Sequence, residues 1–281
     1  MISIIIPAHD ERSVIARTLK AMTDGAKAGE LEVIVVCNGC TDDTADVARS
    51  FGQSVRVIET QYASKPHALN LGDETASTFP RIYVDADVVV TIDTIRALAK
   101  RLTCGDVLAV APTPRINLTG CSWMVRAVFD IRSRLPSARE GIGGSGVYAL
   151  SEAGRRRFRE FPLLTADDGY VRVQFSSTER ETMASISSTV FAPRTFNDLI
   201  ATKTRAHYGS LELANLFPDL WENKGDGNSP ALVSLFKHPW LWHKLFIYCL
   251  ATIIAKRRAR MCLRARTFAW QRDETSRVAA E

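Results

Sequence analysis

The stretch MISIIIPAHDERSVIARTLKAM, residues 1–22, decides the fold class of this chain. Ser3 to Pro7 is a short, mostly apolar run that predicts a buried strand. In the segment that follows, Ile15, Leu19 and Met22 recur at the i, i+4, i+7 spacing of a helix that rests one face on a sheet. The chain is therefore predicted to begin with one unit of strand, polar turn and helix.

The same order of elements repeats along the first part of the chain. Further strands are predicted at residues 31–36, 55–59, 81–84 and 107–111, and helices at 44–51, 65–76 and 92–102. Strands and helices that alternate in this way favour an α/β fold, with a mostly parallel sheet covered by helices on both faces. Beyond residue 111 the alternation weakens, and the main predicted elements are helices at 123–134 and 197–216 and a strand at 183–191.

Polar residues gather where three of these strands end. They occupy residues 7–11, 38–43 and 85–87. Ligands of parallel α/β sheets bind outside the carboxyl ends of the strands. The sequence therefore predicts one ligand site built from three segments that are far apart along the chain.

The segment RIYVDADVVV, residues 81–90, offers the clearest chemistry. Side chains alternate along an extended backbone, so Asp85 and Asp87 can face one ligand at the end of a buried strand. Carboxylate oxygens suit Mg2+ or Mn2+, which complete their coordination with water and substrate phosphates. A pair of surface or capping aspartates is the alternative. We favour a metal site on Asp87 and Asp85 that neutralises charge on a diphosphate leaving group.

A second acidic pair, Asp167 and Asp168, opens a predicted helix in LLTADDGYVR. Carboxylates are stabilised in the first turn of a helix, so capping accounts for one of them. Near a metal, one of the two could orient a ligand while the other accepts a proton from an incoming hydroxyl. The spacing alone leaves both explanations open.

Three single residues are further candidates. Lys65 opens a helix in YASKPHALNLG and could reach a phosphate. Arg205 could do the same from the helix at 197–216, although a lone arginine is more often a surface ion pair. His9 is expected to shape its loop.

Two other patterns suggest chemistry that their context does not support. Cys37 and Cys40 have Cys-x-x-Cys spacing, but the sequence shows neither the further ligands of a zinc site nor the surroundings of a thioredoxin-type pair. The loop GIGGSG, residues 141–146, precedes a strand, whereas a dinucleotide fingerprint opens a helix. It is better explained as a close backbone approach to a ligand or as a flexible turn.

Taken together, the motifs resemble the family 2 glycosyltransferases, which share the GT-A fold. SIIIPAHDE resembles their nucleotide loop, VVCNGCTDDT their base-reading segment, and SKPHALNLG their Lys-x-x-Ala-Leu-Asn-x-Gly motif. YVDADVVV carries their Asp-x-Asp motif, GGSGVYALS resembles their acceptor loop, TADDGYVR the segment with the catalytic base, and TKTRAHYGSLEL the Gln-x-x-Arg-Trp region. The resemblance covers about residues 1–215.

The resemblance implies an inverting transferase that moves one sugar from a nucleotide diphosphate sugar to an acceptor hydroxyl. Asp168, with Asp167 beside it, would be the catalytic base, and Asp87 and Asp85 would hold the metal. The residues expected at the nucleotide and its phosphates are Pro7, His9, Glu11, Asn38, Lys65, Asp85 and Arg205. His207 stands where tryptophan is usual, which argues against a processive polysaccharide synthase.

Two alternatives come from other functional classes. A sugar-1-phosphate nucleotidyltransferase should carry a glycine-rich loop after its first strand, and PAHDERS contains no glycine. A catalytically silent sugar-nucleotide-binding module is the other alternative. The sequence does not specify the donor base, the sugar or the acceptor, which could be a lipid, a saccharide or a metabolite.

The composition bears on where the protein acts. The chain has 281 residues, 46% of them hydrophobic, and can bury a substantial core. Its start lacks the basic leader and long apolar core of a signal peptide, and its six cysteines are scattered. We therefore expect a chain that begins at Met1 and acts in the cytoplasm, and its modest net charge of +5 predicts no nucleic-acid partner.

The C-terminal region has a different character. Residues 238–255 are apolar and aromatic, but their uninterrupted part is shorter than the roughly 20 residues of a spanning helix. A basic segment, residues 256–266, follows. This combination favours a helix that lies in a membrane interface, with a helix packed on the domain as the alternative. We expect peripheral contact through residues 238–266 at the inner face of the plasma membrane, and a division into a transferase domain (1–216), a loop (217–230) and an amphipathic, basic helical segment (231–281).

Overall fold

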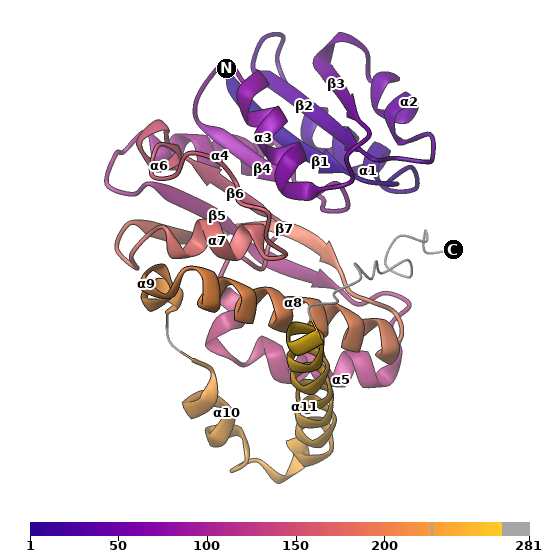
Figure 1. Cartoon of the computed structure of the whole chain (residues 1–281), viewed down its shortest axis with the longest axis vertical. Coiled ribbons are helices and arrows are strands. Elements are labelled where there is room, and N and C mark those ends of the chain that lie inside the picture. Colours follow the sequence, from indigo (N-terminus) through magenta and orange to yellow (C-terminus); the bar gives the residue numbers. More distant parts are fainter. Residues whose placement is uncertain (226, 266–281) are drawn as a thin grey trace.

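The computed structural model describes residues 1–225 and 227–265. A mixed sheet forms the centre of the molecule, with its strands in the order β3-β2-β1-β4-β6-β5-β7 (Figure 1). The strands are β1 (Ile2–Ala8), β2 (Leu31–Asn38), β3 (Val55–Thr60), β4 (Arg81–Val84), β5 (Ala109–Asn117), β6 (Val147–Leu150) and β7 (Arg180–Phe191).

The strand pairing confirms the predicted mostly parallel α/β sheet. Strand β1 pairs parallel with β2 and β4, β2 pairs parallel with β3, and β5 pairs parallel with β7. Strand β6 runs antiparallel to both of its neighbours, β4 and β5. Since β6 is reversed, its amino end lies at the same sheet edge as the carboxyl ends of β1, β2 and β4.

Helices cover both faces of the sheet. One face carries α1 (Ile15–Thr23), α2 (Thr44–Arg49) and α4 (Ile92–Leu102), which bury their apolar sides in a common core with the strands. The other face carries α3 (Lys65–Thr75) and α7 (Asp167–Val173), with the short α6 (Glu152–Arg155) after β6. The predicted face of α1 is confirmed, because Ile15, Leu19 and Met22 are fully buried.

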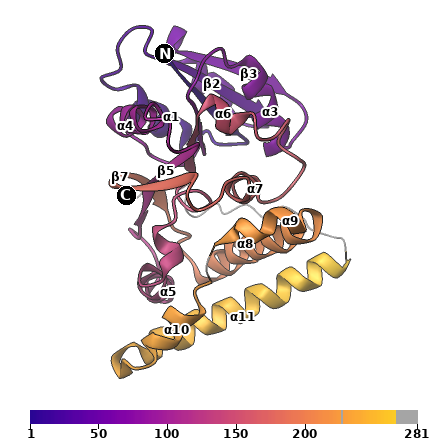
Figure 2. The ribbon, with the colours of Figure 1, turned by 90° about the vertical axis from the view of Figure 1, so that its left-hand side faces the viewer.

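A third layer of helices lies beyond α7. It consists of α5 (Trp123–Ser133), α8 (Phe196–Leu216) and α11 (Trp242–Ala265), which share a separate hydrophobic core. Helix α11 packs against both α8 and α5. Figures 1 and 2 show α8 between α7 and α11, so α11 lies on the side of the layer that faces away from the sheet.

Short helices connect the layers. They are α9 (Pro218–Trp221), α10 (Ser229–Leu235) and the 3-10 turns Gly52–Ser54, Pro136–Arg139, Glu222–Lys224 and Pro239–Leu241. The prediction of a plain loop at 217–230 is therefore wrong. Proline at the start of α9 and of α10 fixes helical backbone angles at those points, and Leu220 and Trp221 of α9 pack on the second core.

The C-terminal helix is longer than the apolar stretch suggested. It continues through the first part of the basic segment to Ala265. Arg266 and the rest of the predicted C-terminal segment, residues 267–281, lie outside the described residues. No helix within 1–225 and 227–265 combines the length and apolarity that crossing a bilayer requires.

Candidate active site

The predicted polar clusters do meet at one sheet edge. They line an open pocket of about 840 Å³ whose walls also include α7, α8 and α11. The sequence-predicted residues that line it are Pro7, His9, Glu11, Asn38, Lys65, Asp85, Asp87, Asp167, Asp168 and Arg205. The parallel register of β1, β2 and β4 explains the meeting, since it brings their carboxyl ends side by side.

One end of the pocket is formed by the loops after β1 and β2. The side-chain amide of Asn38 donates to the carbonyl of Ala8 over 2.8 Å, and Nδ1 of His9 lies 2.6 Å from the carbonyl of Asn38. These bonds tie the two loops together and confirm that His9 shapes its loop. They also fix the Asn38 amide with its nitrogen toward the backbone, so that its oxygen is the atom that can accept from a ligand.

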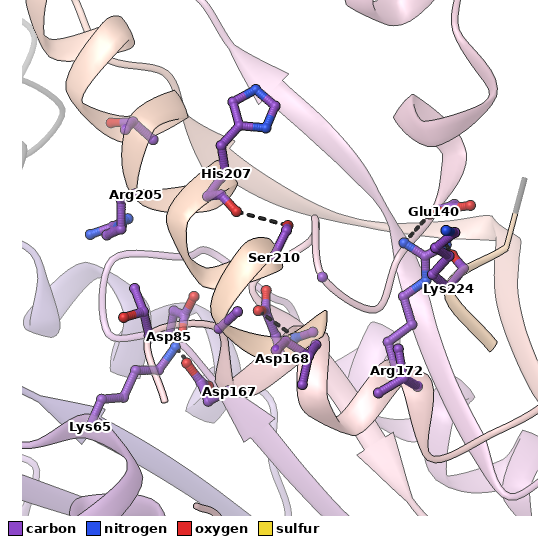
Figure 3. A pocket seen from close by; sticks show the side chains of 18 of the residues that line it. Lys65, Asp85, Glu140, Asp167, Asp168, Arg172, Arg205, His207, Ser210 and Lys224 are labelled. Atoms are coloured by element: carbon purple, nitrogen blue, oxygen red, sulfur yellow. Dashed lines mark hydrogen bonds and ion pairs between the residues drawn. The ribbon is translucent and has the colours of Figure 1, made fainter. Parts of the chain in front are cut away.

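Three charged side chains form the centre of the pocket. Nζ of Lys65, the first residue of α3, lies 2.8 Å from Asp85 and 3.1 Å from Asp167 (Figure 3). Ser64 caps α3 by accepting from the amide of His67, which sets the helix start at Lys65. The sequence indicated each of these residues separately, but only the fold brings α3, the end of β4 and α7 together.

Burial and charge act in opposite directions on this group. Burial raises the pKa of Asp167 from 3.8 to about 6, although the Lys65 ammonium counteracts part of that rise. The same carboxylates raise the pKa of Lys65 well above its usual value in spite of burial. Lys65 is therefore cationic at neutral pH, and Asp167 is mostly ionised.

Asp168 has different surroundings. Its Oδ1 accepts from the amide of Gly169, and its Oδ2 lies near Gly143, where an added Cβ would stand 3.9 Å away. Figure 3 shows Asp168 beside Asp167 but away from Lys65. Asp168 therefore lines the pocket without an ion pair to Lys65, the position a proton acceptor for a bound hydroxyl requires.

The glycine-rich loop comes close to the group of Lys65, Asp85 and Asp167, which we call the acidic centre. Gly146 has φ +63 and its carbonyl accepts from the amide of Asp85 over 2.8 Å. A Cβ on Gly146 would lie 2.5 Å from Val88 and 3.1 Å from Asp85. The backbone of the loop therefore packs closely against the end of β4, and a close approach to a ligand stays a prediction.

Asp85 and Asp87 are both half-buried on the pocket wall. The described residues also hold a group of three other potential ligands, Asp10, Cys40 and Asp42. The carboxylate of Asp10 accepts from the amides of Thr41 and Asp42, so it closes the loop after β2. Loop closure accounts for that group without a metal.

The two cysteines at Cys-x-x-Cys spacing are free thiols. Cys37 is buried in the first core, and its thiol, through a hydrogen bond, lowers the pKa of Cys40 to about 7. Sγ of Cys40 accepts from the amide of Asp10, which again joins the loops after β1 and β2.

Sequence reasoning did not place Arg172, Glu140 or Lys256 at the pocket, and it noted His207 only as a departure from the family pattern. Arg172 of α7 pairs with Glu140 over 2.5 Å at one side, and His207 of α8 and Lys256 of α11 line another. Only the long-range packing of α7, α8 and α11 places these side chains, so no local pattern could have indicated them.

A comparison with protein families identifies relatives. The family model described as Glycosyl transferase family 2 matches residues 3–153. The 4,4'-diaponeurosporenoate glycosyltransferase of Staphylococcus aureus (strain USA300) is 36% identical to this chain over 91 residues, which are 31% of this chain and 24% of that protein. The chain thus spans about a quarter of the length of the curated relatives it matches.

Solved structures resemble the whole chain more broadly. A mannosyltransferase from Pyrobaculum calidifontis in complex with GDP-Man and Mn2+ has a TM-score of 0.60 and 18% identity, over 95% of this chain and 76% of that chain. Glucosyl-3-phosphoglycerate synthase from Mycobacterium tuberculosis, in complex with Mn2+, UDP-Glc and phosphoglyceric acid, has a TM-score of 0.56 and 19% identity, over 76% of this chain and 79% of that chain. These likenesses confirm the GT-A fold.

Proposed function

Because the chain belongs to glycosyl transferase family 2, we propose that this glycosyltransferase moves one sugar from a nucleotide diphosphate sugar to an acceptor hydroxyl and inverts the anomeric centre. The carrying observation is that Asp168 lines the same pocket as the Lys65, Asp85 and Asp167 group and the base-reading candidate Asn38. Positioning of donor and acceptor in that pocket supplies much of the rate enhancement.

The nucleotide lies at the end of the pocket formed by β1 and β2. Pro7, His9 and Glu11 line this end, and the amide oxygen of Asn38 accepts from a base N–H. The diphosphate lies over Lys65, whose charge is stabilised by two carboxylates and remains available to phosphate oxygens. Arg205 of α8 contacts the phosphates from the opposite wall.

The residues at the end of β4 fit a divalent cation. Asp85 gives one carboxylate oxygen to Lys65, and Asp87 lines the same wall. Carboxylate oxygens are the ligands that Mg2+ and Mn2+ take from proteins. We place the cation on Asp87 with help from Asp85, where it supplies positive charge to the diphosphate leaving group.

Asp168 acts as the general base. It takes the proton of the acceptor hydroxyl while the hydroxyl oxygen bonds to the anomeric carbon from the face opposite the diphosphate. The bond between that carbon and the phosphate oxygen breaks, and the electron pair leaves with the nucleoside diphosphate. Lys65 offsets the charge that develops there, and Asp167 holds Lys65 in place.

The decisive test is the replacement Asp168→Asn, which keeps the shape of the side chain and removes its basicity. We expect the turnover of UDP-, GDP- or dTDP-sugars with Mn2+ to fall by about 10² to 10⁴-fold, the usual contribution of general base catalysis, while nucleotide affinity is kept. Turnover that survives unchanged would overturn the assignment of the base. The same screen of donors identifies the preferred nucleotide.

We further propose that the enzyme contacts the inner face of the plasma membrane through α10 and α11. An outer apolar face is exposed there, made of Val233, Phe236, Trp240, Trp242, Phe246, Leu250, Ile253 and Met261. Exposed arginines follow on the same helix, at 257, 258, 260 and 264. Apolar side chains next to a basic stretch suit the interface of an anionic bilayer. In this proposal residues 1–216 form the transferase domain and 231–281 the membrane-contacting extension.

A further inference from the structure

Four basic side chains from three helices meet at the end of the pocket that lies away from the nucleotide loops. They are Arg132 of α5, Lys203 and His207 of α8, and Lys256 of α11. We call this group the inner basic cluster. His207 and Lys256 line the pocket itself, and Lys203 and Arg132 lie next to them. The cluster exists only because α11 packs against both α5 and α8.

The inner basic cluster has no acidic partner in the part of the chain that the structure describes. Asp85 and Asp167 form their ion pairs with Lys65, and Glu140 forms its ion pair with Arg172. The contacts of the cluster are instead aromatic. Nζ of Lys203 lies 5.0 Å from the ring centre of Tyr248, and the Arg132 guanidinium lies 5.6 Å from that of Phe129. Cation–π contacts of this kind replace only part of the lost hydration.

The positive charges of Arg132, Lys203 and Lys256 repel one another, and they help to keep His207 neutral at pH 7. Burial, followed by the charges of Arg132 and Lys256, lowers the pKa of Lys203 to about 8. Burial and the charges of Lys203 and Lys256 lower the pKa of His207 to about 4. Like charges held together in a partly buried place are unfavourable unless an anion joins them. The cluster therefore has the character of an anion site.

Its position relative to the base suggests which substrate the anion belongs to. Helix α8 approaches the start of α7 so closely that a Cβ on Gly209 would lie 2.7 Å from Cβ of Ala166. The pocket wall thus runs from Asp168 along α8 to His207, and the His207 ring points away from the carboxylates (Figure 3). A molecule whose hydroxyl lies at Asp168 can therefore extend toward the cluster.

We propose that the acceptor carries a phosphate group and that the inner basic cluster binds it while the reacting hydroxyl lies at Asp168. This inference rests on the proposed function, because it assigns the second substrate of the same pocket. Phosphate suits the cluster since its oxygens can accept from Lys256 at the pocket wall, and the positive charges of Lys203 and Arg132 next to it attract the same anion. The phosphate belongs either to a soluble phosphorylated metabolite or to a lipid headgroup, and Lys256 on the membrane-facing helix α11 is compatible with both.

The test measures binding of inorganic phosphate to the full chain in the absence of nucleotide and metal, in a Lys65→Met background that removes the donor phosphate contact. We expect Lys203→Met and Lys256→Met each to weaken phosphate binding about tenfold, because each removes one positive charge at or next to the anion. The matched control is Lys100→Met, an exposed lysine on α4, which should leave phosphate affinity unchanged. Phosphate affinity that is equal in all these variants would overturn the proposal.

Two further probes distinguish the sources of the phosphate. Glycerol 3-phosphate represents a soluble acceptor, and phosphatidylcholine vesicles with and without phosphatidylglycerol represent a lipid one. If one of these probes displaces inorganic phosphate, and Lys203→Met and Lys256→Met weaken that displacement, the result supports the proposal and identifies the source of the phosphate. If neither probe displaces inorganic phosphate, the result counts against the proposal. Binding of UDP and GDP is measured separately, on the enzyme with Lys65 intact. Failure to bind either nucleotide would count against the proposed function without changing the result for phosphate binding.

Discussion

Lys65 keeps the buried carboxyl of Asp167 largely ionised. Without a nearby cation, burial alone would favour the neutral acid. The pair lies 3.1 Å apart, and Lys65 also reaches Asp85. Because the pKa of Asp167 rises from 3.8 to about 6 on folding, its ionisation costs stability as pH rises from about 4 to about 6. That cost is consistent with a functional role for the charge.

This arrangement predicts a specific pH dependence. Since Asp167 must be ionised to hold Lys65, kcat/KM should fall as pH drops below about 6. Replacing Lys65 with Met removes the group that Asp167 holds, so the remaining activity should lose this acidic limb. Lys65→Arg keeps the charge and should keep the limb near its wild-type position. An identical limb in Lys65→Met and the wild type would contradict this explanation.

The loop after β2 gives a second prediction at the residue scale. Asn38→Ala removes the amide oxygen that in our proposal accepts from the base, so nucleotide affinity should fall by roughly ten- to a hundredfold, the cost of a buried hydrogen bond. Cys40→Ser is the matched control in the same loop, since a hydroxyl can also accept from the amide of Asp10. Its affinity for UDP or GDP, measured calorimetrically, should stay close to that of the wild type. Equal affinity in Asn38→Ala would show that the loop reads the base in another way.

The individual residues of the acidic centre could be predicted, but their partnership could not. Asp85 and Lys65 follow local patterns, an alternating strand end and a helix start. Their contact with Asp167 depends on α7, which lies far along the chain and packs on the same face of the sheet as α3. Capping, the structural explanation given for one of the two adjacent aspartates, does not account for the burial of Asp167 and its ion pair with Lys65.

At the scale of elements, α11 has one buried and one exposed apolar face. Leu245, Tyr248 and Ala251 are buried against the rest of the third layer, and Trp242, Phe246 and Ile253 are exposed. A helix that only packs on the domain has no need of a large exposed apolar side. The exposed side leads directly to exposed arginines.

Phe246→Glu should weaken binding to vesicles that contain phosphatidylglycerol. Losing the burial of one aromatic side chain and adding repulsion should reduce the partition coefficient by about tenfold or more. Trp123→Glu, at an equally exposed aromatic residue at the start of α5, is the control and should sediment with vesicles as the wild type does. If both variants bind vesicles equally well, α11 does not contact the membrane.

The elements were predictable where the pattern was local. Strands β1 to β4 were predictable because each is a short, mostly apolar run. The helices between them were predictable because their apolar residues recur at helical spacing. The antiparallel direction of β6 could not be predicted from the sequence, because it is set by pairing with β4 and β5 over long sequence distances. The same is true of α9 and α10, whose short sequences carry loop-forming residues and depend on proline and on packing for their helical turns.

At the scale of the whole molecule, the pocket joins two parts of different charge. The sheet edge contributes Asp85, Asp87 and the carboxylates of α7, whereas the third layer contributes the inner basic cluster. A donor diphosphate with its cation suits the first part, and an anionic acceptor suits the second. In our proposals the two substrates therefore bind at opposite ends of one cavity, with Asp168 between them.

The strain in the inner basic cluster leads to a prediction about stability and pH. The folded pKa of Lys203, about 8, lies below its ordinary value of 10.5, so its charge destabilises the fold below pH 8. This cost fades as pH rises from about 8 to 10.5. Lys203→Met should therefore raise Tm by about 2 to 4 °C for each kcal/mol of repulsion removed, measured at pH 7 in phosphate-free buffer.

The same substitution should have less effect near pH 10, where Lys203 is mostly neutral in the folded state. Methionine keeps an apolar contact with Tyr248, so loss of packing does not obscure the result. Lys100→Met, at an exposed lysine far from the cluster, should leave Tm unchanged at both pH values. Added inorganic phosphate should stabilise the wild type and narrow its difference from Lys203→Met, because the anion relieves the repulsion that the substitution removes. A lower Tm for Lys203→Met at pH 7 would mean that the lysine stabilises the fold through its charge. The cluster would then not be an anion site.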